Sequence, residues 1–349
     1  MKTPTIFALL LAAALLPAAA EDFPLCMYGI AGPEDLAVIK KAGFNCFQTY
    51  ERGPEKLAAL AAQAAALQLK MLAHPDKVIG SAYDAEAKGW PMLAWYLCDE
   101  PEVQKLTPAA LAELDRRVKA WDPGHRTAFV MGKGIAAFTY GAAADALMVD
   151  WYPVAHLKLE SVGYQVTLLK EAARKLDPKN PAKPVWAVLQ AFDWLEYPQL
   201  RKPPVGRFPT YAEVRFMSYL SIARGAGGLF YFMYQCKDGP LSKLPERWAL
   251  FEKIAAELNV LRPALGDAAD TPPPPGLGAG LSATVLKNGS RTFMILLNPS
   301  ALPVPVNLSV LKGWQPLFEG NRKLEDLLPG GKARYMPPYR VLVLEQSKT

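Results

Sequence analysis

Cysteine and histidine are scarce in this chain, whose 349 residues include four cysteines and three histidines. The cysteines are too few and too scattered for a disulfide scaffold, and their spacing matches no zinc site. They would allow one bridge in an oxidising compartment, but we expect buried free thiols instead. So few histidines argue against a histidine-rich metal centre, and we expect neither a metal nor an organic cofactor. The cysteines are Cys26, Cys46, Cys98 and Cys236.

Runs of basic residues are also absent, although the net charge is +6. A positive charge can attract an anionic partner. Lysine and arginine are nevertheless spread along the whole chain, so we interpret the charge as a solvated surface and expect no nucleic-acid partner. Hydrophobic residues make up 51% of the chain and charged residues 21%, which indicates a globular protein without a disordered tract.

The apolar segment at the amino terminus is too short for a membrane span. Met1-Lys2 supplies a positive start, residues 6–16 an apolar core, and Ala18-Ala19-Ala20 a small-residue cleavage site. This pattern predicts a secretory signal peptide over residues 1–20, cut near Ala20. We therefore expect an exported protein of a bacterial periplasm or exterior. Cys26 lacks the preceding small residues of a lipid-attachment signal, so we expect no membrane anchor.

Short apolar runs alternate with helical segments from Leu25 to about Tyr234, and this alternation predicts the fold. Helical segments between the runs begin with proline or capping residues, as at Thr107-Pro108 and at Thr210, which has the spacing of a capping box with Glu213. These segments carry apolar residues at helical spacing. Strand-helix units over residues 21–268 match a (β/α)₈ TIM barrel in number and size. A doubly wound open sheet is the alternative, although it rarely needs eight regular units. The apolar runs lie at residues 25–30, 44–50, 69–74, 92–100, 127–131, 146–153, 184–192 and 227–234.

The pattern changes after the barrel segment. Residues 269–278 contain four successive prolines, which is typical of a stiff linker. Helical signals disappear over residues 279–349, where apolar segments flank Asn288-Gly289, a strong signal for a hairpin turn. We therefore expect a small all-β sandwich at the carboxyl end of the chain.

The fourth apolar run ends in two adjacent carboxylates and a proline, Asp99-Glu100-Pro101. The carboxyl ends of barrel strands carry the chemistry, so these acids would lie at the site. Pro101 favours an extended residue before it and directs Glu100 out of the strand end. Neighbours on a regular strand point to opposite faces, so both acids reach one side only with a bulge or a strand end near Asp99. Without such an irregularity, one of the two acids would face away from the site and lie in solvent at the strand end.

Other polar and aromatic residues end the predicted strands and would gather at the same edge of the barrel. Acids, amides and flat rings suit a sugar, whose ring faces are apolar and whose rim carries hydroxyls. We therefore expect a carbohydrate substrate, with Asp150 as a further catalytic candidate and the rest as binding residues. Gln48 and Gln190 bond either substrate hydroxyls or neighbouring loops. The binding candidates are Tyr50, Gln48, Trp151, Tyr152, Gln190, Asp193, Trp194 and Tyr234.

A barrel whose fourth strand ends in an acid-Glu-Pro tripeptide, with a small β-sandwich behind it, resembles the (β/α)₈ glycoside hydrolases. In their large retaining group, an Asn-Glu-Pro-like motif on the fourth strand supplies the acid/base, and a glutamate on the seventh supplies the nucleophile. The resemblance implies that Glu100 is the general acid/base in the hydrolysis of a glycosidic bond. The seventh strand departs from the pattern, because Gln190 stands where the nucleophile would be, and an amide cannot attack an anomeric carbon.

Two arrangements would replace the missing nucleophile. Asp99-Glu100 is similar to the adjacent Asp-Glu pair of barrel enzymes that remove N-acetylhexosamines, including family 123. In these enzymes the acetamido group of the substrate is the nucleophile, the Asp orients it, and the Glu protonates the leaving oxygen. Alternatively, Asp150 on the sixth strand would face Glu100 across the barrel mouth and act with it in an inverting mechanism.

Two other classes of function stay open beside an exported glycoside hydrolase. A degenerate barrel that binds a glycan without cutting it would also explain Gln190. An exported scaffold that uses its sandwich for contacts would have no aromatic-lined cleft. The sequence carries no signal for the identity of the sugar or for an oligomeric state.

Overall fold

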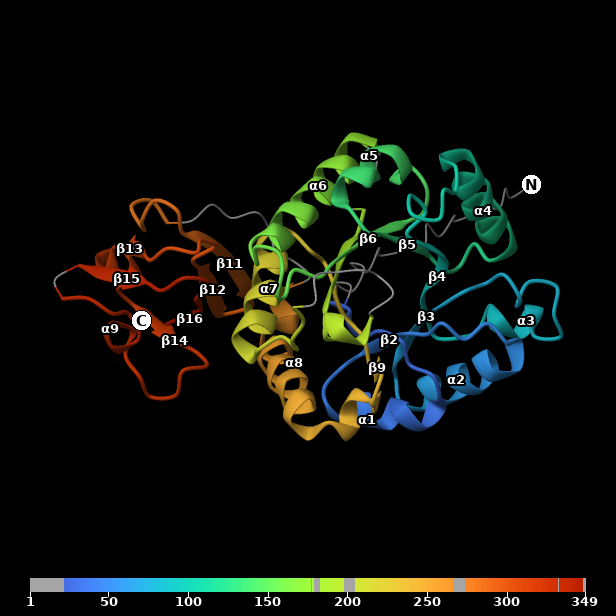
Figure 1. Ribbon diagram of the computed structural model, residues 1–349, viewed down its shortest axis with the longest axis horizontal. Coiled ribbons are helices and arrows are strands. Elements are labelled where there is room, and N and C mark those ends of the chain that lie inside the picture. The colour runs from blue at the N-terminus through green and yellow to red at the C-terminus, as the bar shows by residue number, and fades with distance from the viewer. Residues whose placement is uncertain are drawn as a thin grey trace, which may run out of the picture.

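A computed structural model describes residues 22–176, 178, 183–197, 205–265, 274–331 and 333–347, so the predicted signal peptide lies outside the described residues. Parallel strands β1 to β8 close into a barrel in chain order, with helices around it (Figure 1). The closed barrel confirms the predicted (β/α)₈ fold, and the open-sheet alternative is wrong. The strands are β1 (Leu25–Met27), β2 (Cys46–Gln48), β3 (Lys70–Ala73), β4 (Met92–Asp99), β5 (Thr127–Met131), β6 (Ala146–Trp151), β7 (Val185–Gln190) and β8 (Leu229–Phe232).

Two of the helices begin at capping residues of the sequence. The Thr107 hydroxyl accepts a hydrogen bond from the amide of Ala110 at 3.2 Å, and Thr210 with Glu213 forms a complete capping box. In the described ranges, no helix has the length and apolar character that a membrane span requires. The helices around the barrel are α1 (Leu36–Lys41), α2 (Pro54–Ala66), α3 (Asp84–Ala87), α4 (Pro108–Trp121), α5 (Ala137–Tyr140), α6 (Ser161–Leu176), α7 (Tyr211–Ala223) and α8 (Pro245–Leu265).

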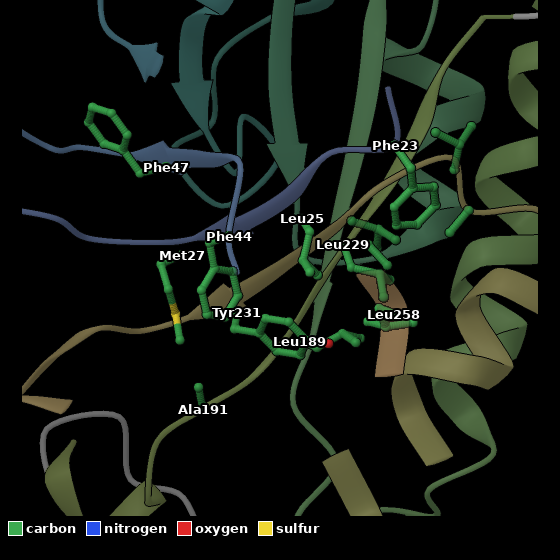
Figure 2. Packing of buried hydrophobic residues seen from close by; sticks show 14 of the residues in the cluster. Phe23, Leu25, Met27, Phe44, Phe47, Leu189, Ala191, Leu229, Tyr231 and Leu258 are labelled. Atoms are coloured by element: carbon green, nitrogen blue, oxygen red, sulfur yellow. The ribbon is translucent and has the colours of Figure 1, made fainter. Parts of the chain in front are cut away.

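Side chains of the strands alternate between the inside of the barrel and the layer beneath the helices. Figure 2 shows the outer layer, where Leu25 of β1 and Tyr231 of β8 lie in one apolar cluster with Leu258 of α8. A separate cluster, which includes Tyr28 and Tyr96, fills the inside. This alternation decides which residues at the carboxyl edge can face a common space.

One cysteine expectation is wrong. Cys26 of β1 and Cys46 of β2 form a disulfide inside the barrel, with their Cα atoms 4.5 Å apart. The two residues are direct partners in the register of neighbouring strands, and both point inward. Their separation in sequence does not reveal this register. Cys98 and Cys236 are buried free thiols, as expected.

The carboxyl-terminal residues form a small antiparallel β domain of two sheets, ordered β11-β12-β16-β14 and β13-β15. Asn288 and Gly289 occupy the predicted hairpin between β11 and β12. The first strand of the smaller sheet is only three residues long, because Asn307 caps a 3₁₀ helix directly after it. The elements are β11 (Ser282–Asn288), β12 (Arg291–Leu297), β13 (Val304–Val306), β14 (Trp314–Pro316), α9 (Leu324–Leu327), β15 (Arg334–Met336) and β16 (Val341–Gln346).

The larger sheet of this domain is buried on both faces. Met294 and Leu296 of β12 pack in one apolar cluster with residues of β13 and β15, so two sheets enclose a common layer. Phe293 and Ile295, on the opposite face, belong to the large cluster of the barrel. The guanidinium of Arg215 on α7 also donates to the carbonyl of Val341 at 2.7 Å. The barrel and the β domain therefore share an apolar contact along α7 (Figure 1).

Candidate functional site

A cavity of about 560 Å³ opens at the carboxyl edge of the barrel. Its lining comes mainly from the ends of β4 to β8 and from the loops that follow them. A site of this volume accommodates a small ligand such as one or two sugar rings. The carboxylates that line it are Asp99, Glu100, Glu102 and Asp150. The predicted aromatic residues that line it are Tyr50, Trp151, Tyr152 and Trp194.

The end of β4 has the irregularity that two neighbouring acids need to share one side. The register between β4 and β5 shifts between Tyr96 and Asp99, which marks a bulge. Leu97 and Cys98 consequently both lie in the outer apolar layer, and Asp99 lines the cavity. Contrary to the expectation from the following proline, Glu100 is not extended, because its φ of +39° lies in the left-handed region that non-glycine residues rarely adopt. The bulge and this turn place both carboxylates in one cavity.

Tyrosine hydroxyls hold the carboxylate of Asp99. The Tyr96 hydroxyl donates to Oδ1 of Asp99 at 2.5 Å, and the Tyr28 hydroxyl donates to that of Tyr96 at 2.7 Å. Tyr50 also donates a hydrogen bond to Asp99. Burial raises the pKa of Asp99, while the bonds from Tyr96 and Tyr50 and the charge of Arg52 oppose the rise. The result is a fixed carboxyl group inside an aromatic setting.

A glycine makes room for Glu100. Gly132 directly follows β5, and a Cβ atom at this position would overlap the carboxylate of Glu100. The φ of Gly132 is not in the left-handed region, so the backbone conformation does not require a glycine. The glycine is needed because its lack of a side chain lets the carboxylate approach closely. Glu100 therefore leaves β4 and lies against the end of the neighbouring strand.

Asp150 lies near both acids of β4. It continues the inward-facing series of β6 after Met148 and lines the cavity. Burial raises its pKa well above the usual range, and the charges of Glu100 and Asp99 raise it further. Its Oδ1 atom is buried and has no hydrogen-bond partner among the described residues. Three carboxyl groups thus share one low-dielectric space, in which full ionisation is unfavourable.

Aromatic rings form the wall opposite the acids of β4. Tyr152 and Phe232 are stacked, with ring centroids 5.5 Å apart, and Phe192 meets both rings edge-on. The indole nitrogen of Trp194 donates to the Tyr152 carbonyl at 3.2 Å, and that of Trp151 donates to Ser161 at 2.7 Å. These bonds fix the two indoles, and the aromatic residues that line the cavity give it an apolar side that suits a sugar ring.

Four predicted binding residues do not line the cavity. Gln190 is fully buried, and its amide bonds the backbone nitrogen and oxygen of Val154 at 2.8 and 2.6 Å. Gln48 is fully buried and accepts a hydrogen bond from the amide of Gly29. Asp193 caps a 3₁₀ helix, and the hydroxyl of Tyr234 donates to Asp35. These groups connect loops to the barrel.

Several lining residues are not among those predicted from the sequence. Most of them lie in a strand interior or a loop turn, where the sequence carries no signal for a site. Pro101 followed by an acid was a usable signal for Glu102, because the turn after a barrel strand faces the site. The residues are Tyr28, Glu102, Gly132, Lys133, His156, Phe192 and Phe232.

A second cavity, of about 790 Å³, opens at the opposite end of the barrel. Its lining includes residues that precede the strands, such as Pro24, Arg126 and Pro184, and among the described lining residues only Asp22 is a carboxylate. Barrel enzymes place their chemistry at the carboxyl edge. Within the described ranges, no group of three or more His, Cys, Asp or Glu side chains is arranged to hold a metal ion.

Comparisons with known proteins identify the fold. No protein-family model and no curated protein sequence matches the chain. Among solved structures, Amy13B from Eubacterium rectale is similar with a TM-score of 0.58 and 9% identity, over 95% of this chain and 96% of that protein.

Two further solved structures are similar to about the same degree. A glycoside hydrolase of family 5 from Bacteroides vulgatus has a TM-score of 0.56 and 14% identity, over 94% of this chain and 89% of its own. A protein described as a glycoside hydrolase has a TM-score of 0.56 and 15% identity, over 93% and 92%. At these identities the likeness is one of fold, and it covers the barrel together with the β domain.

Proposed function

We propose that the protein is an exported glycoside hydrolase in which Glu100 is the general acid and Asp99 its partner. The observation that carries the proposal is the bulge at the end of β4, which brings both carboxylates into one cavity with an aromatic wall. The fold shared with glycoside hydrolases of known structure supports it. The fold alone does not determine a reaction, so the argument rests on the site.

The geometry favours the pair Asp99-Glu100 over a nucleophile on the seventh strand. Gln190 ends β7, and its amide is used up by the backbone of the neighbouring loop. Asp99 instead accepts hydrogen bonds from two tyrosines and keeps a defined orientation. A fixed carboxylate beside a general acid is suited to orient a 2-acetamido group that attacks the anomeric carbon.

The reaction would proceed in two steps. The acetamido oxygen of the substrate forms a bond to the anomeric carbon, while the bond to the leaving oxygen breaks and that oxygen takes the proton of Glu100. Water then attacks the anomeric carbon and reopens the cyclic intermediate, and Glu100 takes the proton of the water. Asp99 hydrogen-bonds the acetamido nitrogen in both steps.

Asp150 supplies the alternative partner. Burial and the charges of the neighbouring acids raise the pKa of Asp150, so its charged form is disfavoured. The base of an inverting reaction must carry that charge, so Asp150 is the weaker candidate for this role. A protonated Asp150 would instead donate a hydrogen bond to the substrate.

The disulfide supports the exported location. Cys26 and Cys46 are bonded within the barrel, and bridges of this kind persist in oxidising compartments. A secretory signal at residues 1–20 would deliver the protein there. Size comparison of the secreted and the full-length chain, with the amino terminus of the mature protein sequenced, tests cleavage near Ala20.

The test of the activity is aryl glycoside hydrolysis by wild type, Glu100→Gln, Asp99→Asn and Asp150→Asn, with sugars that carry or lack a 2-acetamido group. Cleavage confined to acetamido sugars and lost in the first two variants supports the proposal. If ordinary hexosides are cleaved and Asp150→Asn abolishes this cleavage, Asp150 rather than Asp99 is the partner of Glu100. Glycan binding without cleavage, unchanged in Glu100→Gln, would show that the barrel is a binding protein.

A further inference from the structure

The cavity holds a carboxylate that the proposed reaction does not use. Glu102 lines the cavity two residues after Glu100, in the turn that follows β4. Both of its carboxylate oxygens are buried and have no hydrogen-bond partner among the described residues. The turn itself is fixed, because the amides of Val103 and Gln104 donate to the carbonyl of Glu100 at 2.9 and 3.0 Å. The fold therefore holds Glu102 at this position.

A buried carboxylate without donors is unfavourable, since it loses its hydration and receives no hydrogen bond in exchange. Buried polar groups nearly always have partners, so an exception calls for a specific reason. A bound molecule that supplies the missing donors is such a reason. The space next to Glu102 is the cavity that it lines, so a ligand in this cavity is the nearest source of such donors.

Glu102 and Asp99 approach Glu100 from different sides. Asp99 turns into the barrel, where it accepts the hydrogen bond from Tyr96. Glu102 lies over the end of β5, with Oε1 3.6 Å from the position of a Cβ atom at Gly132, against which the Glu100 carboxylate also lies. In the proposed reaction Asp99 orients the sugar that carries the acetamido group and the attacked anomeric carbon. The other side of Glu100 then faces the leaving group.

We propose that Glu102 binds a leaving-group sugar, its two carboxylate oxygens accepting hydrogen bonds from two adjacent hydroxyls of that ring. The inference rests on the proposed function and specifies its substrate class, an oligosaccharide whose leaving group is itself a sugar. A carboxylate presents two acceptors side by side, which matches a pair of neighbouring hydroxyls. Bonds to a charged acceptor are stronger than bonds between neutral groups.

The experiment compares two substrates with the same glycone in wild type and Glu102→Gln. One is the aryl glycoside that the wild type cleaves fastest, and the other is the disaccharide in which a sugar replaces the aryl group. We expect kcat/KM for the disaccharide to fall about tenfold or more in the variant, and that for the aryl glycoside to stay within about twofold. Glu113→Gln, on the exposed face of α4, removes the same charge and should change neither value.

Equal losses on both substrates, or no loss on either, overturn the role of Glu102. A melting temperature of Glu102→Gln at or above that of the wild type is expected, because the buried charge is removed. If the wild type cleaves no glycoside, the proposed function fails separately, and a glycan array decides the inference. Weaker capture of glycans by Glu102→Gln then supports a sugar-binding role, whereas equal capture, or no capture by the wild type, overturns it.

Discussion

The ends of β4 and β7 occupy equivalent places at the carboxyl edge of the same barrel, yet they use their polar groups differently. At β4, a bulge and a left-handed residue turn two carboxylates into the cavity. At β7, the amide of Gln190 bonds the backbone of Val154 and the carbonyl of Phe192. One strand end presents its groups to a ligand, and the other supports the wall of the site.

The comparison shows that position at a strand end does not by itself give a residue a chemical role. What the side chain does depends on the loop and strand end that the fold places beside it. Gln190 meets a loop that turns its peptide groups inward, whereas Glu100 meets Gly132, which offers space and no side chain. The predictions below alter one of these two strand ends, or a residue beside them, at a time.

The largest effect is expected from removal of the acid at β4. Glu100→Gln keeps the shape of the side chain but cannot donate a proton to the leaving oxygen. The expected loss in kcat on a disaccharide is about 10²- to 10⁴-fold, the usual contribution of a general acid. Steady-state kinetics measures it, with Glu113→Gln as the charge-matched variant. Retention of more than a tenth of the activity would remove Glu100 from its proposed role.

A carboxylate at β7 should destabilise the protein rather than restore a nucleophile. In Gln190→Glu, an acceptor-only group would face the carbonyls of Val154 and Phe192, which now accept hydrogen bonds from the amide. The expected cost is about 3 kcal/mol of unfolding free energy, as for other buried charges left without a partner. Urea unfolding measures it, and Gln68→Glu at an exposed position should be nearly neutral. A stable and more active Gln190→Glu would contradict the structural role.

A methyl group at the end of β5 should displace the acid. In Gly132→Ala the added Cβ overlaps the Glu100 carboxylate, so kcat should fall about 10- to 100-fold, as expected for a misplacement of about 1 Å. The acidic and basic limbs of the pH–rate profile should also shift, which a purely global loss of stability would not produce. Gly227→Ala, whose Cβ would make only a normal 3.9 Å contact with the Val185 carbonyl, should behave as wild type.

The last prediction concerns His74, which packs against Tyr96, the donor to Asp99, with ring centroids 4.8 Å apart. Burial, with the charge of Arg52, lowers the pKa of His74 to about 4. In the unfolded chain the histidine takes up a proton near pH 6.5, whereas the folded protein resists it down to about pH 4. The stabilising contribution of neutral His74 is therefore complete above pH 6.5 and is lost as the pH falls toward 4.

Each pH unit in that window should remove up to about 1.4 kcal/mol of unfolding free energy through this residue. Thermal or urea unfolding between pH 8 and pH 4 measures the slope, and His74→Phe should flatten it while leaving the values above pH 7 parallel to the wild type. Identical slopes in the two proteins would mean that His74 does not titrate as described.

Several elements could be read from the sequence with nearly correct bounds. The run at residues 127–131 is β5 without change, and Thr107 and Thr210 cap the helices that they were expected to begin. The hairpin at Asn288-Gly289 also forms as expected. These features depend on hydrophobic periodicity and on turn chemistry within a few residues, so the local sequence is sufficient to determine them.

The sequence was a poorer guide to which residues form the site. Asp99, Glu100 and Asp150 line one cavity, as the strand-end positions indicated, whereas Gln190 and the side-chain oxygen of Gln48 bond backbone groups. Nothing local distinguishes these cases, because an amide and an acid at a strand end look alike until the opposing loop is placed. The pairing of Cys26 with Cys46 depends in the same way on the register between two strands.

The sequence by itself determined a barrel of eight units with acids at the end of its fourth strand, followed by a small β domain. The physical reason is that burial of apolar residues dominates the free energy of folding, and the spacing of these residues is visible in the sequence. Only the tertiary structure decided which polar groups face the cavity. That choice follows from a bulge after Tyr96, from the absence of a side chain at Gly132, and from the partners that distant loops bring to each strand end.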